Sequence, residues 1–143
     1  MSAGYGLGRV FNVIPAASGV SVPLTRAGRV SFVTYEDDGS TIATITEVDS
    51  TGTNSEQALD VDFYPHKAPG VGGTWTAMAE QDDTVDLGDD TTNDCMVLDV
   101  DAAQLSDGYD SVQCTVDGGI CIAVVYDLTE QRKPANLRSN IVA

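Results

Sequence analysis

Basic residues are scarce in this chain of 143 residues, which has 7 Lys and Arg against 22 Asp and Glu and a net charge of −15. A charge of this sign repels nucleic-acid phosphates and anionic lipids, so we expect neither nucleic acid nor a membrane as a partner. No stretch approaches the ~20 apolar residues of a membrane helix. Cysteines number only three, and a domain of this length can bury a core without a disulfide framework.

The few cations are placed at the two ends. Residues 1–35 carry +3, residues 36–117 carry −19 and residues 118–143 carry +1, and Lys67 is the only basic residue of the middle segment. We predict an acidic body that faces solvent and basic ends that contact a polar or acidic neighbour. The alternative is that the acidity serves solubility alone, as in a high-salt host.

Catalytic, metal and cofactor motifs are lacking as well. The one histidine, His66, is predicted to lie in a proline-bounded loop, and no Ser or Cys nucleophile motif accompanies it. The glycines of residues 4–8 lack the Lys-Ser/Thr of a phosphate-binding loop. The acidic tract Glu80–Asp94 lacks the spacing of a calcium motif, so we interpret it as a solvated loop. We therefore expect no enzyme, no catalytic residue, no metal and no cofactor.

What the chain does have is β periodicity almost throughout. Its β-branched and aromatic runs are separated by segments rich in Gly, Asp, Asn and Pro, a spacing typical of sandwiches and jelly rolls. We predict an all-β, single-domain β-sandwich, jelly-roll-like, with extended N- and C-terminal segments: residues 1–130 form the sandwich with an N-terminal arm, and residues 131–143 form a C-terminal arm. The predicted strands are Gly8–Ile14, Val30–Tyr35, Thr41–Val48, Ala58–Tyr64, Thr74–Ala79, Met96–Val100, Ser111–Val116 and Ile120–Leu128.

Two strand pairs are predicted as hairpins. One joins Val30–Tyr35 to Thr41–Val48, and the other joins Ser111–Val116 to Ile120–Leu128 through Asp117-Gly118-Gly119. The last strand is apolar on both faces, so we expect it to be central or covered.

One short helical turn is predicted at Asp101–Leu105, with Asp101 as its cap and Gly108 as its stop.

The cysteines are predicted to be buried thiols without a bridge. In the second hairpin, Cys114 and Cys121 would be diagonal neighbours, a geometry that disfavours a disulfide. No two of the cysteines have the spacing of a zinc site.

The C-terminal third resembles small virion proteins of tailed viruses, of the kind encoded beside the major capsid protein. The resemblance rests on residues 97–102, 105–110, 126–128 and 131–137, and the earlier hairpin and Thr74-Trp75-Thr76 are similar to the same group. It implies a non-enzymatic β-sandwich that decorates or cements the head shell, commonly as trimers, with the major capsid protein as partner.

We therefore expect a virion structural protein that is made in the host cytoplasm and resides on the head surface. A tail-tube or head-completion protein is the alternative within virions. A carbohydrate-binding module that stacks sugars on Tyr64, Trp75 and Tyr109 is the alternative from another class. The residues predicted to contact the partner are Arg9, Arg26, Arg29, Arg132, Lys133, Asn136, Leu137 and Arg138.

Overall fold

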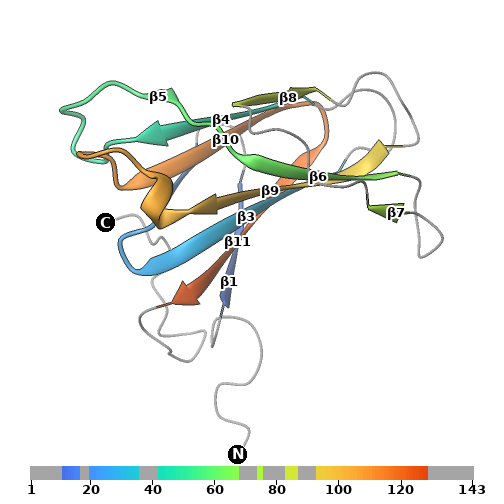
Figure 1. Ribbon diagram of the computed structural model, residues 1–143, viewed down its shortest axis with the longest axis horizontal. Helices are drawn as coiled ribbons and strands as arrows, with labels where there is room; N and C mark the ends of the chain where they lie inside the picture. Colours follow the sequence, from blue (N-terminus) through green and yellow to red (C-terminus); the bar gives the residue numbers. More distant parts are fainter. Residues whose placement is uncertain are drawn as a thin grey trace, which may run out of the picture.

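Two antiparallel sheets make up the protein, as a computed structural model that describes residues 11–16, 20–35, 42–67, 74–75, 83–86 and 93–128 shows (Figure 1). One sheet, here called sheet A, has the strand order β1-β11-β3-β9-β6-β7. The other, sheet B, has the order β2-β10-β4-β5, with β8 also paired to β4. The elements are β1 (Phe11–Pro15), β2 (Ser21–Pro23), β3 (Ala27–Tyr35), β4 (Ile42–Val48), β5 (Gln57–Ala58), β6 (Asp62–Lys67), β7 (Thr74–Trp75), β8 (Thr84–Asp86), β9 (Asn93–Asp101), the 3₁₀ turn η1 (Ala102–Gln104), β10 (Ser111–Asp117) and β11 (Ile120–Leu128).

The strand pairing follows the jelly-roll pattern. The outermost strands in sequence pair with each other, β1 with β11, and the pairs β2·β10, β3·β9 and β4·β5 follow inward, all antiparallel. A chain that is first folded into one long hairpin and then rolled into two layers gives this nesting. The prediction of an all-β, jelly-roll-like sandwich is confirmed for the described residues.

Both predicted hairpins are wrong as pairings. β3 pairs with β11 and β9 in sheet A, while β4 pairs with β10, β5 and β8 in sheet B. β10 and β11 likewise lie in different sheets, and the turn between them crosses from one layer to the other through Gly118 (φ 87°) and Gly119 (φ 77°). Alternation reveals that a segment is a strand and which face is buried, but it carries no information on the partner strand.

Several strand boundaries also differ from the prediction. The segment predicted as Ala58–Tyr64 is divided between β5 and β6, and β6 extends through His66, which was expected in a loop. β8 lies inside the acidic tract that was interpreted as a loop, because its backbone pairs with β4. β2 was not predicted, because proline, here Pro23, is typical of a break in a strand. The structure accommodates Pro23 because β2 is an edge strand.

The core is the apolar filling between the two sheets. Sheet A contributes Phe32, Leu98 and Val125, and sheet B contributes Ile45 and Val112, all buried. β11 lies between β1 and β3, so the prediction that it is central is confirmed.

A polar seam closes one end of the core. Glu47, 1% exposed on the inner face of β4, accepts a hydrogen bond from the Ser106 backbone N–H (2.8 Å) and another from Gln57 Nε2. The predicted turn is present as η1, where Asp101 and Gln104 form a reciprocal capping box. Gly108 lies beyond the turn with φ 90°, while η1 itself ends at Leu105.

Candidate interaction surface

The two outward faces of the sandwich have opposite character. The outer face of sheet B presents Thr44, Thr46, Gln113 and Thr115, which lie opposite one another on β4 and β10. Polar side chains are expected on a sheet face that is exposed to water. The outer face of sheet A is largely apolar, and an exposed apolar patch of this kind indicates an interaction surface.

Cross-strand rows define this apolar surface. In one row Pro15, Ile122, Val33 and Val97 stand side by side on β1, β11, β3 and β9. The neighbouring rows add Ile120 with Tyr35, and Val13 with Val124. Ile120 is 60% exposed, Tyr35 44% and Ile122 37%. The apolar face, as we call it below, consists of Val13, Pro15, Val33, Tyr35, Val97, Ile120, Ile122 and Val124.

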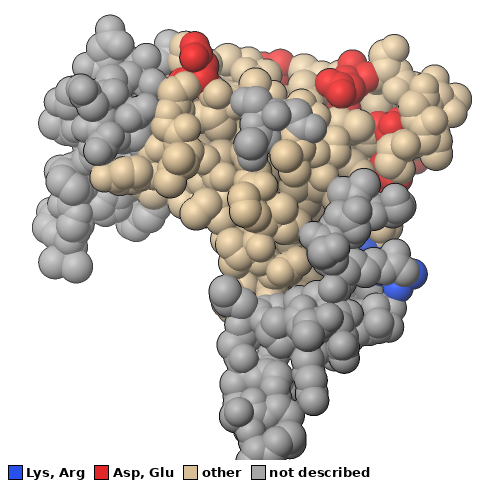
Figure 2. Space-filling view, turned by 180° about the vertical axis from the view of Figure 1, so that it is seen from behind, with Lys and Arg blue, Asp and Glu red and all other residues tan. Residues whose placement is uncertain are grey.

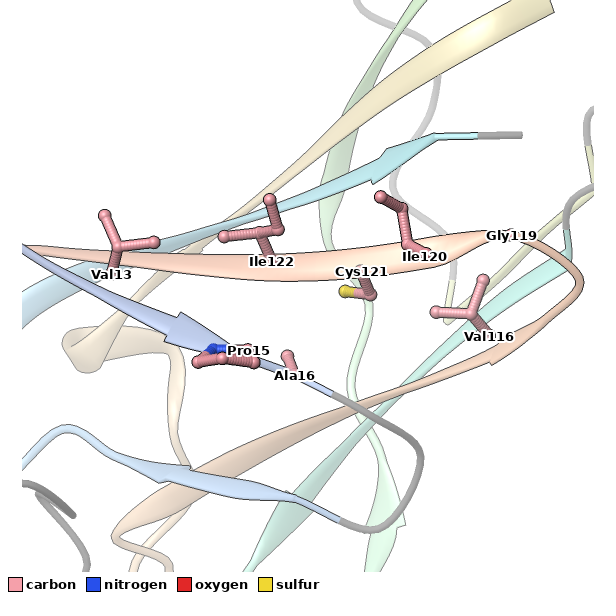
Figure 3. A pocket seen from close by; sticks show the side chains of 8 residues that line it. All are labelled: Val13, Pro15, Ala16, Val116, Gly119, Ile120, Cys121 and Ile122. Atoms are coloured by element: carbon pink, nitrogen blue, oxygen red, sulfur yellow. The ribbon is translucent and has the colours of Figure 1, made fainter. Parts of the chain in front are cut away.

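The apolar face continues into a pocket at one corner of the sandwich (Figure 3). The pocket has a volume of about 620 Å³, within the usual range of ligand pockets. It lies where β1 ends and β11 begins, beside the backbone hydrogen bond from Ala16 N–H to Cys121 C=O (3.0 Å). Its lining is Val13, Pro15, Ala16, Val116, Gly119, Ile120, Cys121 and Ile122, with no charged side chain.

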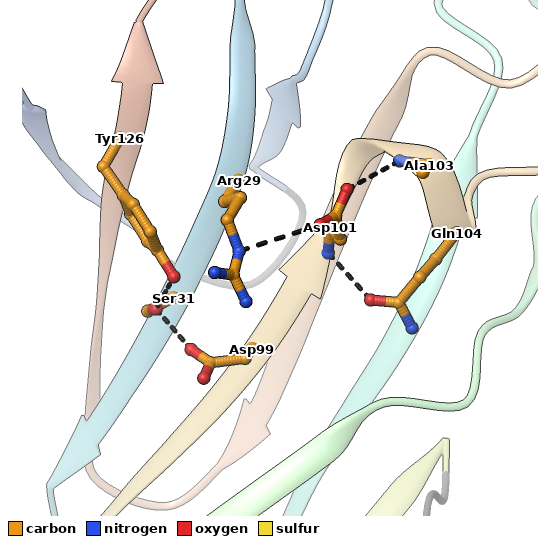
Figure 4. Close-up of polar contacts among 7 residues, drawn as sticks. All are labelled: Arg29, Ser31, Asp99, Asp101, Ala103, Gln104 and Tyr126. Carbon is orange, nitrogen blue, oxygen red and sulfur yellow. Dashed lines mark hydrogen bonds and ion pairs between the residues drawn. The ribbon is translucent and has the colours of Figure 1, made fainter.

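The opposite end of the sheet A face is polar (Figure 4). Ser31 Oγ donates to a carboxylate oxygen of Asp99 and lies 3.2 Å from Tyr126 Oη. Arg29 Nε is 3.8 Å from Asp101 Oδ2, and its guanidinium carbon lies 5.6 Å from the centre of the Tyr126 ring. The face therefore changes from apolar at the corner pocket to an ion pair and a hydrogen-bonded carboxylate at the other end.

Charge is absent from much of the visible surface. Figure 2 shows acidic side chains along the upper edge and the right side of the described part, and the described basic side chains below them at the lower right. The described surface in the centre of this view is uncharged.

Of the eight residues predicted to contact a partner, the structure describes two. Arg26 lies in the bend before β3, half-buried, and Arg29 lies on β3 at the polar end of the sheet A face, with 44% of its side chain exposed. Both therefore come from the same stretch of chain. The other six, Arg9, Arg132, Lys133, Asn136, Leu137 and Arg138, lie outside the described residues, as do both predicted arms.

The acidic body contains one tightly bonded loop after β4. Asp49 accepts hydrogen bonds from the Thr51 hydroxyl (2.7 Å), the backbone N–H groups of Thr51 and Asn54, and Asn54 Nδ2. These bonds, with the Thr51 hydroxyl as the largest contribution, lower the pKa of Asp49 from 3.8 to about 2. Asp110 accepts from Ser50 in the same loop. Both carboxylates accept hydrogen bonds from groups of the protein itself, so we interpret this loop as structural.

No group of three or more metal-ligating side chains comes together among the residues that the structure describes. None of the helices in that part of the chain is long and apolar enough to cross a membrane.

Comparison with known proteins gives one family. Residues 13–93 match the family model described as the siderophore-interacting FAD-binding domain, a range of more than half of the chain. The chain belongs to this siderophore-interacting FAD-binding domain family. The range matched to the family runs from β1 to the first residue of β9, so β10 and β11 lie beyond it. No curated protein matches the chain.

One solved structure is similar at low level. The crystal structure of the Yersinia pseudotuberculosis-derived mitogen has 6% sequence identity and a TM-score of 0.31, over 93% of this chain and 97% of that one. A TM-score this low carries no information on function.

Proposed function

We propose that the protein is a virion structural protein that attaches to the head shell of a tailed virus by laying the apolar face of sheet A on the major capsid protein. The observation that carries the proposal is the contrast between the Thr-rich outer face of sheet B and the Val- and Ile-rich outer face of sheet A. Removing apolar surface from water contributes roughly 25 cal/mol per Å², so contact between the apolar face and a matching apolar patch on the shell would stabilise the attachment. A repeating lattice multiplies such contacts through avidity.

The charge distribution suits this attachment. A net charge of −15 favours solubility and would keep decorated particles apart, while the apolar face itself has no charged member that a contact would bury. Arg29, at the polar end of the same face, stays partly exposed and can still donate to a carboxylate or carbonyl of the shell. The resemblance to virion proteins adds the trimeric state to the proposal, and the sequence adds the two predicted arms.

The family name implies FAD as a cofactor, but the residues that the structure describes do not fit a FAD site. A dinucleotide needs cations or converging N–H groups for its pyrophosphate, commonly at a helix N-terminus. The corner pocket has an apolar lining, and Arg29 is already paired with Asp101 on the sheet face. We therefore assign no step of the function to FAD. Titration of the protein into FAD is expected to leave flavin fluorescence unchanged, and saturable quenching would contradict this assignment.

A tail-tube or head-completion role would use the same face and differ only in where it attaches. The carbohydrate-binding alternative is less well supported by the geometry. Tyr109 lies in the loop before β10 and donates its hydroxyl to the Ser55 carbonyl (2.7 Å), whereas Tyr64 lies on β6 in sheet A opposite Val97. These two rings do not form one stacking platform, and the Trp75 side chain lies outside the described part.

Cryo-electron microscopy of purified particles of the virus that encodes the chain tests the proposal. We expect jelly-roll density on the outer head surface at three-fold or quasi-three-fold positions, with sheet A toward the shell. Density in the tail or the neck would favour the alternative within virions. Absence of the protein from particles would refute a structural role in the virion.

A further inference from the structure

Two cysteines meet where the chain crosses between the sheets. Cys114 on β10 of sheet B and Cys121 on β11 of sheet A both point into the core, and their thiols share a hydrogen bond. They approach because the turn at Gly118 and Gly119 lies between them at the corner. The sequence-based expectation of diagonal neighbours in one hairpin is therefore wrong, and with it the reason for disfavouring a bridge.

Only one of the two thiols has access to the outside. Cys114 is fully buried, whereas Cys121 is 9% exposed and lines the corner pocket (Figure 3). The pocket wall is apolar, and the protein carries strong negative charge, so a small neutral oxidant can enter more readily than an anionic one such as a charged peptide disulfide.

We propose that Cys121 is a modification site for small neutral peroxides, reached through the corner pocket, and that its oxidation leads to a disulfide bond with Cys114 that joins the two sheets. This inference does not depend on the proposed virion role.

The chemistry balances with the peroxide as the only co-reactant. The Cys121 thiolate attacks a peroxide oxygen, the O–O bond breaks, and a sulfenic acid forms with release of water. The Cys114 sulfur then attacks the Cys121 sulfur, the S–O bond breaks, and the hydroxide leaves as water with the Cys114 proton. Two thiols are oxidised by two electrons, and hydrogen peroxide is reduced to two molecules of water.

Access assigns these roles, because Cys121 lines the corner pocket and Cys114 is fully buried, and the hydrogen bond between the thiols acts in the same direction. The bond from Cys114 lowers the pKa of Cys121 against the opposing effect of burial, and the same bond together with burial raises the pKa of Cys114. Cys121 is both the accessible thiol and the one with the lower pKa, so it is the attacking residue, and Cys114 resolves the intermediate.

The test treats the reduced, folded protein with hydrogen peroxide, then unfolds it in an alkylating agent and maps peptides without reduction. We expect two of the three thiols to disappear, one link between Cys114 and Cys121 within a single chain, reversal by dithiothreitol, and a rise in Tm of roughly 5–10 °C in the oxidised form.

Variants separate the steps. Cys114→Ala should stop at a sulfenic acid on Cys121 that dimedone traps, Cys121→Ala should leave Cys114 unreacted, and Cys95→Ala, a half-buried control on β9, should behave like the wild type. The proposal is overturned if wild type and Cys95→Ala keep Cys114 and Cys121 reduced, if the link joins Cys95 to another chain, or if Cys114 oxidises as fast without Cys121. If either core variant does not fold, the link map of wild type and Cys95→Ala decides alone.

Discussion

Neutralising the buried carboxylate of Glu47 is expected to weaken the fold measurably. Glu47 links β4 to Gln57 of β5 and to the loop before β10, and its side chain has almost no contact with water. In Glu47→Gln the shape is kept, but one acceptor becomes an NH₂ group that faces an existing donor. A lost hydrogen bond to a charged group contributes about 1.5–3 kcal/mol, and an unsatisfied donor costs about 1–3 kcal/mol, so we expect a loss of roughly 2–4 kcal/mol in the free energy of unfolding.

The assay is urea unfolding at neutral pH, followed by far-ultraviolet circular dichroism and by the fluorescence of the single tryptophan. Glu56→Gln is the matched control, because Glu56 is exposed in the same β4–β5 connection and its neutralisation changes the net charge equally. We expect that control to stay within about 0.5 kcal/mol of the wild type. Equal stability of Glu47→Gln and Glu56→Gln would refute the claim that the buried carboxylate holds this end of the sandwich.

Two further predictions concern the acidic loop and the C-terminal arm. The folded-state pKa of Asp49 is about 2, below its ordinary 3.8, so its contribution to stability is fully present above pH 4 and is lost as the pH falls toward 2. Between these pH values the urea midpoint of the wild type should therefore fall more steeply than that of Asp49→Asn. The exposed Asp107→Asn is the control, and parallel curves for wild type and Asp49→Asn would contradict the prediction. Deletion of residues 131–143 should leave Tm nearly unchanged, because the last strand that the structure describes ends at Leu128, but should lower particle occupancy because three cations are lost. Equal occupancy would argue against a binding arm, and a lost melting transition would assign the segment to the core.

The sequence predicted strands well where the inward residues alternate with outward ones. β3, β4, β10 and β11 were found from this pattern, and the apolar character of both faces of β11 correctly placed that strand inside a sheet. Partner strands were not predictable, because a Gly-Gly turn is compatible both with a hairpin and with a crossing between layers. β2 and β8 escaped detection because three-residue strands carry too little periodicity.

The candidate surface was predicted only in part. Arg29 was identified from its charge, but its pairing with Asp101 depends on the register between β3 and β9. The apolar face is formed by residues of four strands, and only Ile120, Ile122 and Val124 of β11 gave a signal in the sequence. The contact between Cys114 and Cys121 depends on the two sheets being opposed, which no local pattern encodes.

Attachment through the apolar face is tested most directly by one binding measurement. Undecorated heads are mixed with wild type, Ile120→Asp or Thr115→Asp, and the protein bound per particle is quantified after sedimentation. Ile120 and Thr115 are both exposed and lie near the same corner, on sheets A and B respectively, so each variant adds one negative charge to a different outer face. With Tm unchanged in both, we expect Ile120→Asp to lose most of its occupancy and Thr115→Asp to keep that of the wild type. Undiminished binding of Ile120→Asp, or an equal loss in the two variants, would contradict attachment through the apolar face.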